Sequence, residues 1–259
     1  MTIEPHIEHV TTDDGVSLAC RSFGSGPPII YQFSAPAFSN FEMELAFPPA
    51  LATYETIARV ATVIRYDFRN TGLSTRGIED VSIRAHIRDL DAVRRHFRLE
   101  SAVLVFPFAS ARIAVEYAAA QPERVTALML WSPELHRETG LRIQGVADLL
   151  QAALRIGPEA YASILAVIVV GLESHANTAW LARYLFESAN ADDWIRTSAA
   201  VDQHDARAAA AKVRAPTLFL YRRLPIYNAG PASAEVIREY RASITRRWRC
   251  GLLRVKQAL

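Results

Sequence analysis

Apolar and polar positions along the chain follow two kinds of pattern. Continuous apolar runs over residues 102–106 and 126–131 have the length and composition of buried strands. Between them, apolar residues over 113–118 recur at helical spacing until Pro122 ends the pattern. A further segment, 82–97, places its apolar residues along one face of a helix whose outer face is basic. The centre of the chain is therefore predicted as helix, strand, tight turn, helix and strand.

The segments before and after this central part also show strand-like and helical patterns. Strand-like runs within 9–23 surround Asp14-Gly15, which is a strong hairpin signal. The apolar residues 29–31 begin another buried strand. From about 140 to 200 the pattern is helical throughout, and Ala215-Pro-Thr217 opens a later strand. Sheet-forming segments are thus expected on both sides of a long helical stretch.

Two motifs carry a resemblance to a known fold. Residues 117–125, Y-A-A-A-Q-P-E-R-V, and 65–74, R-Y-D-F-R-N-T-G-L-S, are similar to segments of the α/β-hydrolase fold. The second is closest to the R-Y-D-x-R-G-T-G-L-S hydrolases that occur alone or beside transcription-regulator and cyclase domains. The resemblance implies an α/β architecture with a mostly parallel central sheet, helices on both faces and an inserted helical cap. It also implies three parts: 1–139 as N-terminal core, 140–200 as cap and 201–259 as an incomplete C-terminal core.

The strand-to-helix turn departs from the family pattern where the chemistry is expected. In such proteins a G-x-S-x-G-G turn carries the nucleophilic serine, and its glycines allow a strained backbone and close packing. Alignment backwards from Arg112 places Phe106 on the first glycine, Phe108 on the serine, and Ser110 and Ala111 on the later glycines. A phenylalanine side chain has no nucleophilic atom. The resemblance and the loss of its chemistry therefore fall on the same residues.

The rest of the acyl-transfer apparatus is also altered. The family's oxyanion-hole glycine is missing, although the side chains of Gln32 and Ser34 could donate hydrogen bonds there. Leu224 lies near the place of the acid that orients the catalytic histidine, and no histidine follows His204. In subtilisin, loss of the serine or the histidine alone lowers turnover by roughly a millionfold. The sequence predicts a catalytically inactive protein that binds an apolar small molecule or a partner, with Gln32, Ser34 and Phe108 at the ligand site.

An active serine hydrolase or esterase is the alternative. Ser110 would then be a shifted nucleophile, with His136 or His204 as its base and Glu134 or Asp205 as the acid. Against this, serine at the start of a helix commonly caps it, and Glu134 is typical of a loop residue. A decayed or truncated gene product is a third alternative. Poor folding of the isolated chain would favour it, because loss of the last strand would leave an open sheet edge.

Other conspicuous side chains are assigned structural roles. Asp67 and Arg69 in the second motif are expected to support a loop, and Asn70 replaces a glycine at a position where asparagine tolerates left-handed backbone. His86 and His96 are expected on the surface of the basic helix, not as ligands. The aromatic residues of the predicted cap indicate a hydrophobic cavity or a helical core.

Composition narrows the class of protein further. The chain has 259 residues, and its 29 basic and 27 acidic residues nearly cancel, so nothing favours nucleic-acid binding. Cys20 and Cys250 lack metal-ligand or redox spacing, and we expect reduced thiols, no metal and no cofactor. No segment has the length of a membrane span and no signal peptide is recognisable, so we expect a cytoplasmic protein without a membrane partner. Nothing specifies an oligomeric state.

The last residues change composition sharply. Residues 241–259 hold six basic residues and no acidic one. This tail fits a divergent last strand, an altered reading frame or a basic contact surface.

Overall fold

The computed structural model describes residues 6–136, 144–171 and 174–220. The tail and Leu224 lie outside these residues, as does Cys250. In chain order the elements are β1 (Glu8–Thr11), β2 (Ser17–Gly24), β3 (Pro28–Tyr31), α1 (Phe41–Leu45), α2 (Pro48–Ala58), β4 (Thr62–Tyr66), α3 (Ile83–His96), β5 (Ala102–Pro107), the 3₁₀ turn η1 (Phe108–Ser110), α4 (Ala111–Ala120), the 3₁₀ turn η2 (Pro122–Arg124), β6 (Val125–Trp131), α5 (Gln144–Ile156), α6 (Pro158–Val170), α7 (His175–Ser188), α8 (Ala191–Asp202), α9 (Arg207–Ala210) and β7 (Thr217–Leu220).

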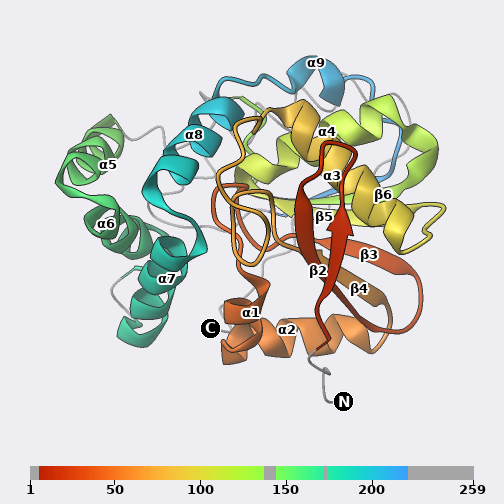
Figure 1. Ribbon diagram of the computed structural model, residues 1–259, viewed down its shortest axis with the longest axis horizontal. Helices are drawn as coiled ribbons and strands as arrows, with labels where there is room; N and C mark the ends of the chain where they lie inside the picture. Colours follow the sequence, from red (N-terminus) through yellow and green to blue (C-terminus); the bar gives the residue numbers. More distant parts are fainter. Residues whose placement is uncertain (1–5, 137–143, 172–173, 221–259) are drawn as a thin grey trace.

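The strands form one mostly parallel sheet in the order β1-β2-β4-β3-β5-β6-β7. Strand β2 pairs antiparallel with β1 and β4, and the remaining pairs are parallel. The first pair is the hairpin expected at Asp14-Gly15, where Gly15 has a φ of 82°. Helices surround the sheet, and α5, α6 and α7 lie to one side of it (Figure 1). The predicted α/β class with a mostly parallel sheet is confirmed.

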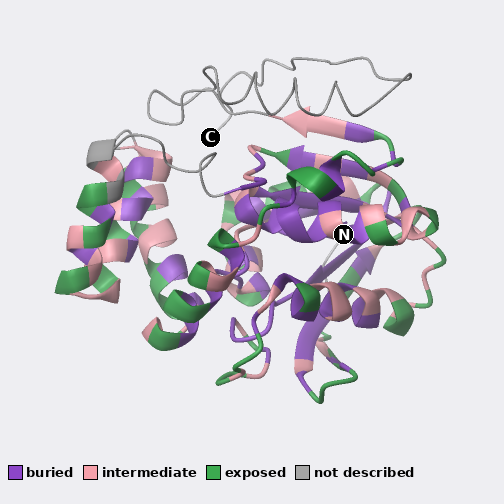
Figure 2. Ribbon diagram, turned by 90° about the horizontal axis from the view of Figure 1, so that it is seen from above, coloured by how far each residue is buried: buried purple, intermediate pink, exposed green. Residues whose placement is uncertain are grey.

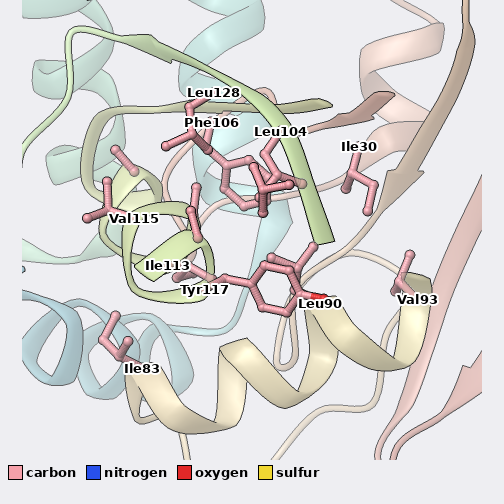
Figure 3. Packing of buried hydrophobic residues seen from close by; sticks show 14 of the residues in the cluster. Ile30, Ile83, Leu90, Val93, Leu104, Phe106, Ile113, Val115, Tyr117 and Leu128 are labelled. Atoms are coloured by element: carbon pink, nitrogen blue, oxygen red, sulfur yellow. The ribbon is translucent and has the colours of Figure 1, made fainter. Parts of the chain in front are cut away.

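Successive residues of the central strands enter different layers of the core, because strand side chains alternate between faces. Leu104 and Phe106 of β5 pack in the cluster that contains residues of α3 and α4, including Leu90 (Figure 3). Val103 and Val105 instead belong to the cluster on α2. The strands are accordingly rich in buried residues in Figure 2. Continuous apolar runs in β5 and β6 follow from this two-sided burial.

Helix α3 begins where the sequence predicts, but it buries a histidine. Ser82 caps the helix, since its Oγ accepts a hydrogen bond from the backbone N–H of Ala85 at 3.2 Å. His96 lies toward the surface, and its Nε2 is 2.9 Å from a carboxylate oxygen of Glu8. His86, however, is completely buried, so its expected surface position is wrong. The reason is spacing: it follows Ile83 by three residues and therefore shares the inward face of the helix.

Four helices, α5 to α8, lie between β6 and β7, in the stretch whose pattern is helical. They form their own apolar cluster, to which the loop after β3 contributes Ala37 and Phe38. Tyr184 and Trp194 are buried in this cluster, whereas Phe186 is 44% exposed. In the part of the chain that the structure describes, no helix is both long enough and apolar enough to cross a bilayer.

Candidate functional site

Strand β5 turns sharply into α4 at Phe108. The strand ends at Pro107, and the short turn η1 separates it from the first helical residue, Ala111. Phe108 has a φ of 49°, which is a left-handed conformation that bulky residues rarely adopt. A strained residue between strand and helix is the feature that presents the serine in a nucleophile elbow. In this chain the residue with that backbone is a phenylalanine.

Ser110 lies two residues further on, behind the turn. Its φ of −64° is helical and its side chain is fully buried. The hydroxyl donates a hydrogen bond to the backbone carbonyl of Pro107 and does not cap α4. A buried hydroxyl that is satisfied by its own backbone is poorly placed to attack a substrate.

The bases and acids considered for Ser110 make contacts with other residues. The Nε2 atom of His204 lies 2.7 Å from Oε1 of Glu116 on α4. Asp205 binds the guanidinium of Arg207 at 2.6 Å, and this hydrogen bond lowers the pKa of Asp205 to about 2. His136 is buried and also acts to lower the pKa of Asp205. Ser110 takes part in none of these interactions.

Glu134 lies directly against the elbow. Its backbone N–H donates a hydrogen bond of 3.1 Å to the carbonyl of Phe108. Burial raises the pKa of its carboxyl group to about 7; Arg112 opposes this shift and Asp202 adds to it. A carboxyl group with a pKa raised by burial is found at functional sites and also in structural networks of charged groups. The sequence pattern does not reveal the raised pKa of Glu134, because the groups that act on it, Arg112 and Asp202, are distant in sequence.

Arg112 joins the helix after the elbow to the end of α8. Its side chain is fully buried, and Nε donates to the carbonyl of Glu134 at 2.9 Å. The same guanidinium donates to the carbonyl of Val201 and lies 3.5 Å from Oδ1 of Asp202. A single arginine thus fixes the exit of β6 and the last turn of the helical insertion relative to the elbow.

The two side chains expected to replace the oxyanion hole are engaged in internal hydrogen bonds. The Nε2 atom of Gln32 donates to the carbonyl of Tyr66 at 3.2 Å, and its Oε1 accepts from Arg65. The hydroxyl of Ser34 lies 3.0 Å from the hydroxyl of Tyr184 on α7. Both residues therefore support the loop after β3 in this structure.

A buried ion pair lies beneath that loop. Arg65 and Glu44 are 2.6 Å apart and each is at most 1% exposed. Glu44 also accepts hydrogen bonds from Tyr54 at 2.5 Å and from Tyr184 at 2.8 Å. Such pairs are stable only when hydrogen bonds satisfy the remaining polar atoms, as they do here. The sequence does not reveal this cluster, which joins α1, α2, β4 and α7.

The R-Y-D-F-R-N-T-G-L-S segment organises loops, in agreement with its structural interpretation. The carboxylate of Asp67 accepts hydrogen bonds from the hydroxyl of Ser39 and from the backbone N–H groups of Phe41 and Leu73, at 2.9 to 3.0 Å. Burial raises the pKa of Asp67 to about 6, although Arg65 opposes the shift. Asn70 has a φ of 66°, the left-handed backbone that asparagine tolerates.

One cavity of about 300 Å³ lies at the helical insertion, away from these groups. It is lined by residues of α6, α7 and α8 and by the loop after β3: Phe38, Pro158, Tyr161, Ala162, Leu185, Phe186, Ala189, Asn190, Ala191 and Trp194. Phe108, Gln32 and Ser34 do not line it. Within the described residues, no group of three or more histidine, cysteine, aspartate or glutamate side chains is arranged to hold a metal ion.

Solved structures of similar shape are hydrolases and related proteins. An esterase from Exiguobacterium antarcticum matches with a TM-score of 0.73 at 17% identity, over 90% of this chain and 86% of that one. A hydrolase from Pseudomonas aeruginosa PA01 matches with a TM-score of 0.71 at 17% identity, over 92% and 87%. A bromoperoxidase from Bacillus anthracis matches with a TM-score of 0.70 at 14% identity, over 88% and 87%. No protein-family model and no curated protein sequence matches the chain.

Proposed function

We propose that this chain, which has the α/β-hydrolase fold, does not hydrolyse substrates through a serine nucleophile and instead binds an apolar small molecule. The observation that carries the proposal is Phe108, whose φ of 49° gives the elbow its strained backbone without a nucleophilic atom. In this proposal the helices α5 to α8 act as the cap that selects the ligand.

Acyl transfer requires a nucleophile, a base that accepts its proton and donors aimed at the developing oxyanion. Ser110 donates its hydrogen bond to a backbone carbonyl, which cannot act as a general base. Gln32 and Ser34 donate or share their hydrogen bonds within the protein. The imidazole of His204 contacts Glu116 and not Ser110. These observations support the absence of triad chemistry independently of one another.

An esterase assay tests this proposal. We expect purified protein to hydrolyse short-chain p-nitrophenyl esters no faster than buffer does. The Ser110→Ala variant tests the alternative nucleophile, and Ser101→Ala, at the half-buried serine before β5, is its matched control. Turnover that Ser110→Ala abolishes and Ser101→Ala leaves intact would overturn the proposal.

The second candidate function is an active esterase or related hydrolase. It is favoured by the solved structures of the same fold, several of which are described as esterases. It is also favoured by Glu134, whose raised pKa suits a proton-transfer role beside the elbow. A fluorophosphonate probe followed by peptide mapping distinguishes the two: we expect no labelled serine, whereas labelling of Ser110 would establish the hydrolase.

A further inference from the structure

We infer that the cavity between Phe38 and helices α6 to α8 binds a small neutral aromatic molecule that carries a hydrogen-bond acceptor. This inference deepens the proposed function and rests on it, because it assigns the ligand to the helical insertion and not to the elbow. The shape of the cavity, its polar groups and its charge each point to this class of ligand.

Four of the ten lining residues are aromatic, and apart from Asn190 the others are small or aliphatic. The ring of Trp194 contacts those of Phe38 and Tyr161, with ring centroids 5.5 Å and 4.3 Å away. Ala162 on α6 and Leu185 on α7 add aliphatic surface. At about 300 Å³ the cavity is at the lower end of the range for ligand pockets, which suits one or two fused rings. Edge-on and offset contacts with the three rings would favour a flat ligand.

Two polar groups on the lining residues have no partner among the described residues. They are the hydroxyl of Tyr161 and the indole N–H of Trp194, although Trp194 is only 6% exposed. Tyr161 is half-buried, and neither donor is among the buried polar atoms that lack a partner, so both are accessible at the cavity and can donate to a ligand. The amide of Asn190, in contrast, caps α8 through Asp193. A carbonyl or ether oxygen on the ligand would complete the hydrogen bonding of the cavity.

The charges around the cavity disfavour an anion. None of its ten lining residues is basic. Burial raises the pKa of Tyr161 to about 12, and Asp202 and Glu134 contribute to the same shift. The phenol therefore stays protonated as a donor, and no basic side chain among the lining residues would stabilise a negative ligand. A neutral molecule does not need a basic partner and is therefore favoured over an anion.

Three probes of nearly equal shape test the ligand class by isothermal titration calorimetry. We expect 2-acetonaphthone, which has a carbonyl acceptor, to bind and to quench tryptophan fluorescence. We expect 2-isopropylnaphthalene, which lacks the acceptor, to bind about threefold to tenfold more weakly, the effect of one hydrogen bond. We expect no binding of 2-naphthoate at the same concentration. Equal affinity for the ketone and the carboxylate would overturn the inference.

Variants locate the binding. Ala162→Phe fills the cavity, and Ala191→Leu narrows it from the first turn of α8, so each is expected to lower the affinity for 2-acetonaphthone at least tenfold. Trp194→Phe keeps an aromatic ring but removes the N–H, and is expected to reduce the preference for the ketone. Ile195→Ser is the control, because Ile195 is 45% exposed and does not line the cavity. Unchanged binding by both filled variants, with thermal unfolding confirming that they are folded, contradicts the inference.

Esterase assays on the same preparations separate this inference from the proposed function. Turnover that depends on Ser110 would overturn the proposed function and remove the premise of this inference, whatever the probes show. Absence of both turnover and probe binding would overturn only the assignment of the ligand to this cavity.

Discussion

At the scale of single residues, a buried histidine makes the fold sensitive to acid. Both ring nitrogens of His86 lack hydrogen-bond partners among the described residues, and its Nδ1 lies 3.7 Å from the carboxylate of Asp89. Burial lowers the pKa of His86 to about 3, and the nearby Arg69 adds to the shift while Asp80 opposes it. In the unfolded chain an imidazole takes up a proton below about pH 6.5. The unfolded state therefore binds more protons below that pH, and stability falls as the pH drops.

We predict that His86→Phe removes this part of the acid sensitivity. Between pH 8 and pH 5 the wild type is expected to lose about 2 kcal/mol of unfolding free energy more than the variant does. The raised pKa values of Asp67 and Glu134 act in the opposite direction in both proteins, so the comparison isolates His86. Urea unfolding at the two pH values gives the result. The exposed residue His175 supplies the control, since His175→Gln is expected to retain the wild-type difference.

Gly72 is a residue whose conformation and surroundings both require glycine. Its φ is 51°, and a Cβ atom there would lie 2.0 Å from Oδ2 of Asp67. We predict that Gly72→Ala lowers the unfolding free energy by at least about 2 kcal/mol, through backbone strain and displacement of Asp67. Gly77 has a φ of 74°, but a Cβ atom there would have no other atom within 4 Å, so Gly77→Ala should cost only about 1 kcal/mol. Equal losses in chemical unfolding would show that the contact with Asp67 is unimportant.

At the scale of elements, α7 is attached to the core by the hydroxyl of Tyr184, by a stack of rings and by the carbonyl of Ser188, which accepts a hydrogen bond of 2.8 Å from the backbone N–H of Gly72. The hydroxyl of Tyr184 reaches Glu44 beneath the loop after β3, as well as Ser34 within that loop. On the same helix, the ring of Trp180 stacks on Phe47 at a centroid distance of 3.9 Å. The position of the helical insertion therefore depends on polar groups of α1 and of the loop after β3.

We predict that Tyr184→Phe loosens this attachment. Removal of the hydroxyl leaves one oxygen of the buried Glu44 with fewer donors, which typically costs about 1–3 kcal/mol. Hydrogen exchange of α7 amides should accelerate more than that of β5 amides. Tyr31→Phe is the matched control, because Tyr31 is also buried but its hydroxyl makes no hydrogen bond to the described residues. The same change of exchange in both variants would assign the effect to packing alone.

At the scale of the whole molecule, the fold and the chemistry of the elbow are separable. The sheet order, the turn at Phe108 and the buried ion pair are all present without a serine at the apex. A nucleophile restored at that place would still lack the other parts of a triad. In subtilisin, removal of the serine or the histidine alone lowers turnover about as much as removal of all three triad members.

We therefore predict that Phe108→Ser gains no esterase activity and is not labelled by a fluorophosphonate. The relevant comparison is wild-type protein, assayed with the same p-nitrophenyl esters. Rapid labelling at position 108 in this variant would show that a competent base already faces the apex, and the missing serine would then be the only defect.

The sequence predicts elements whose signals are local. Apolar runs mark β5 and β6 because these strands are buried on both faces, and Ser82 marks the start of α3 because its side chain caps the next turn. His86 is missed because a polar residue on an apolar face looks like surface when its neighbours are unknown. The pairing of Glu44 with Arg65 and the burial of Glu134 depend on residues distant in sequence. Patterns within a short stretch of sequence cannot predict contacts of this kind.

The left-handed backbone at Phe108 has a consequence for which side chains the turn can carry. The bend between β5 and α4 carries a phenylalanine, so this backbone does not depend on a serine at that place. Side chains of different chemistry can therefore occupy that place while the strand and the helix keep their arrangement.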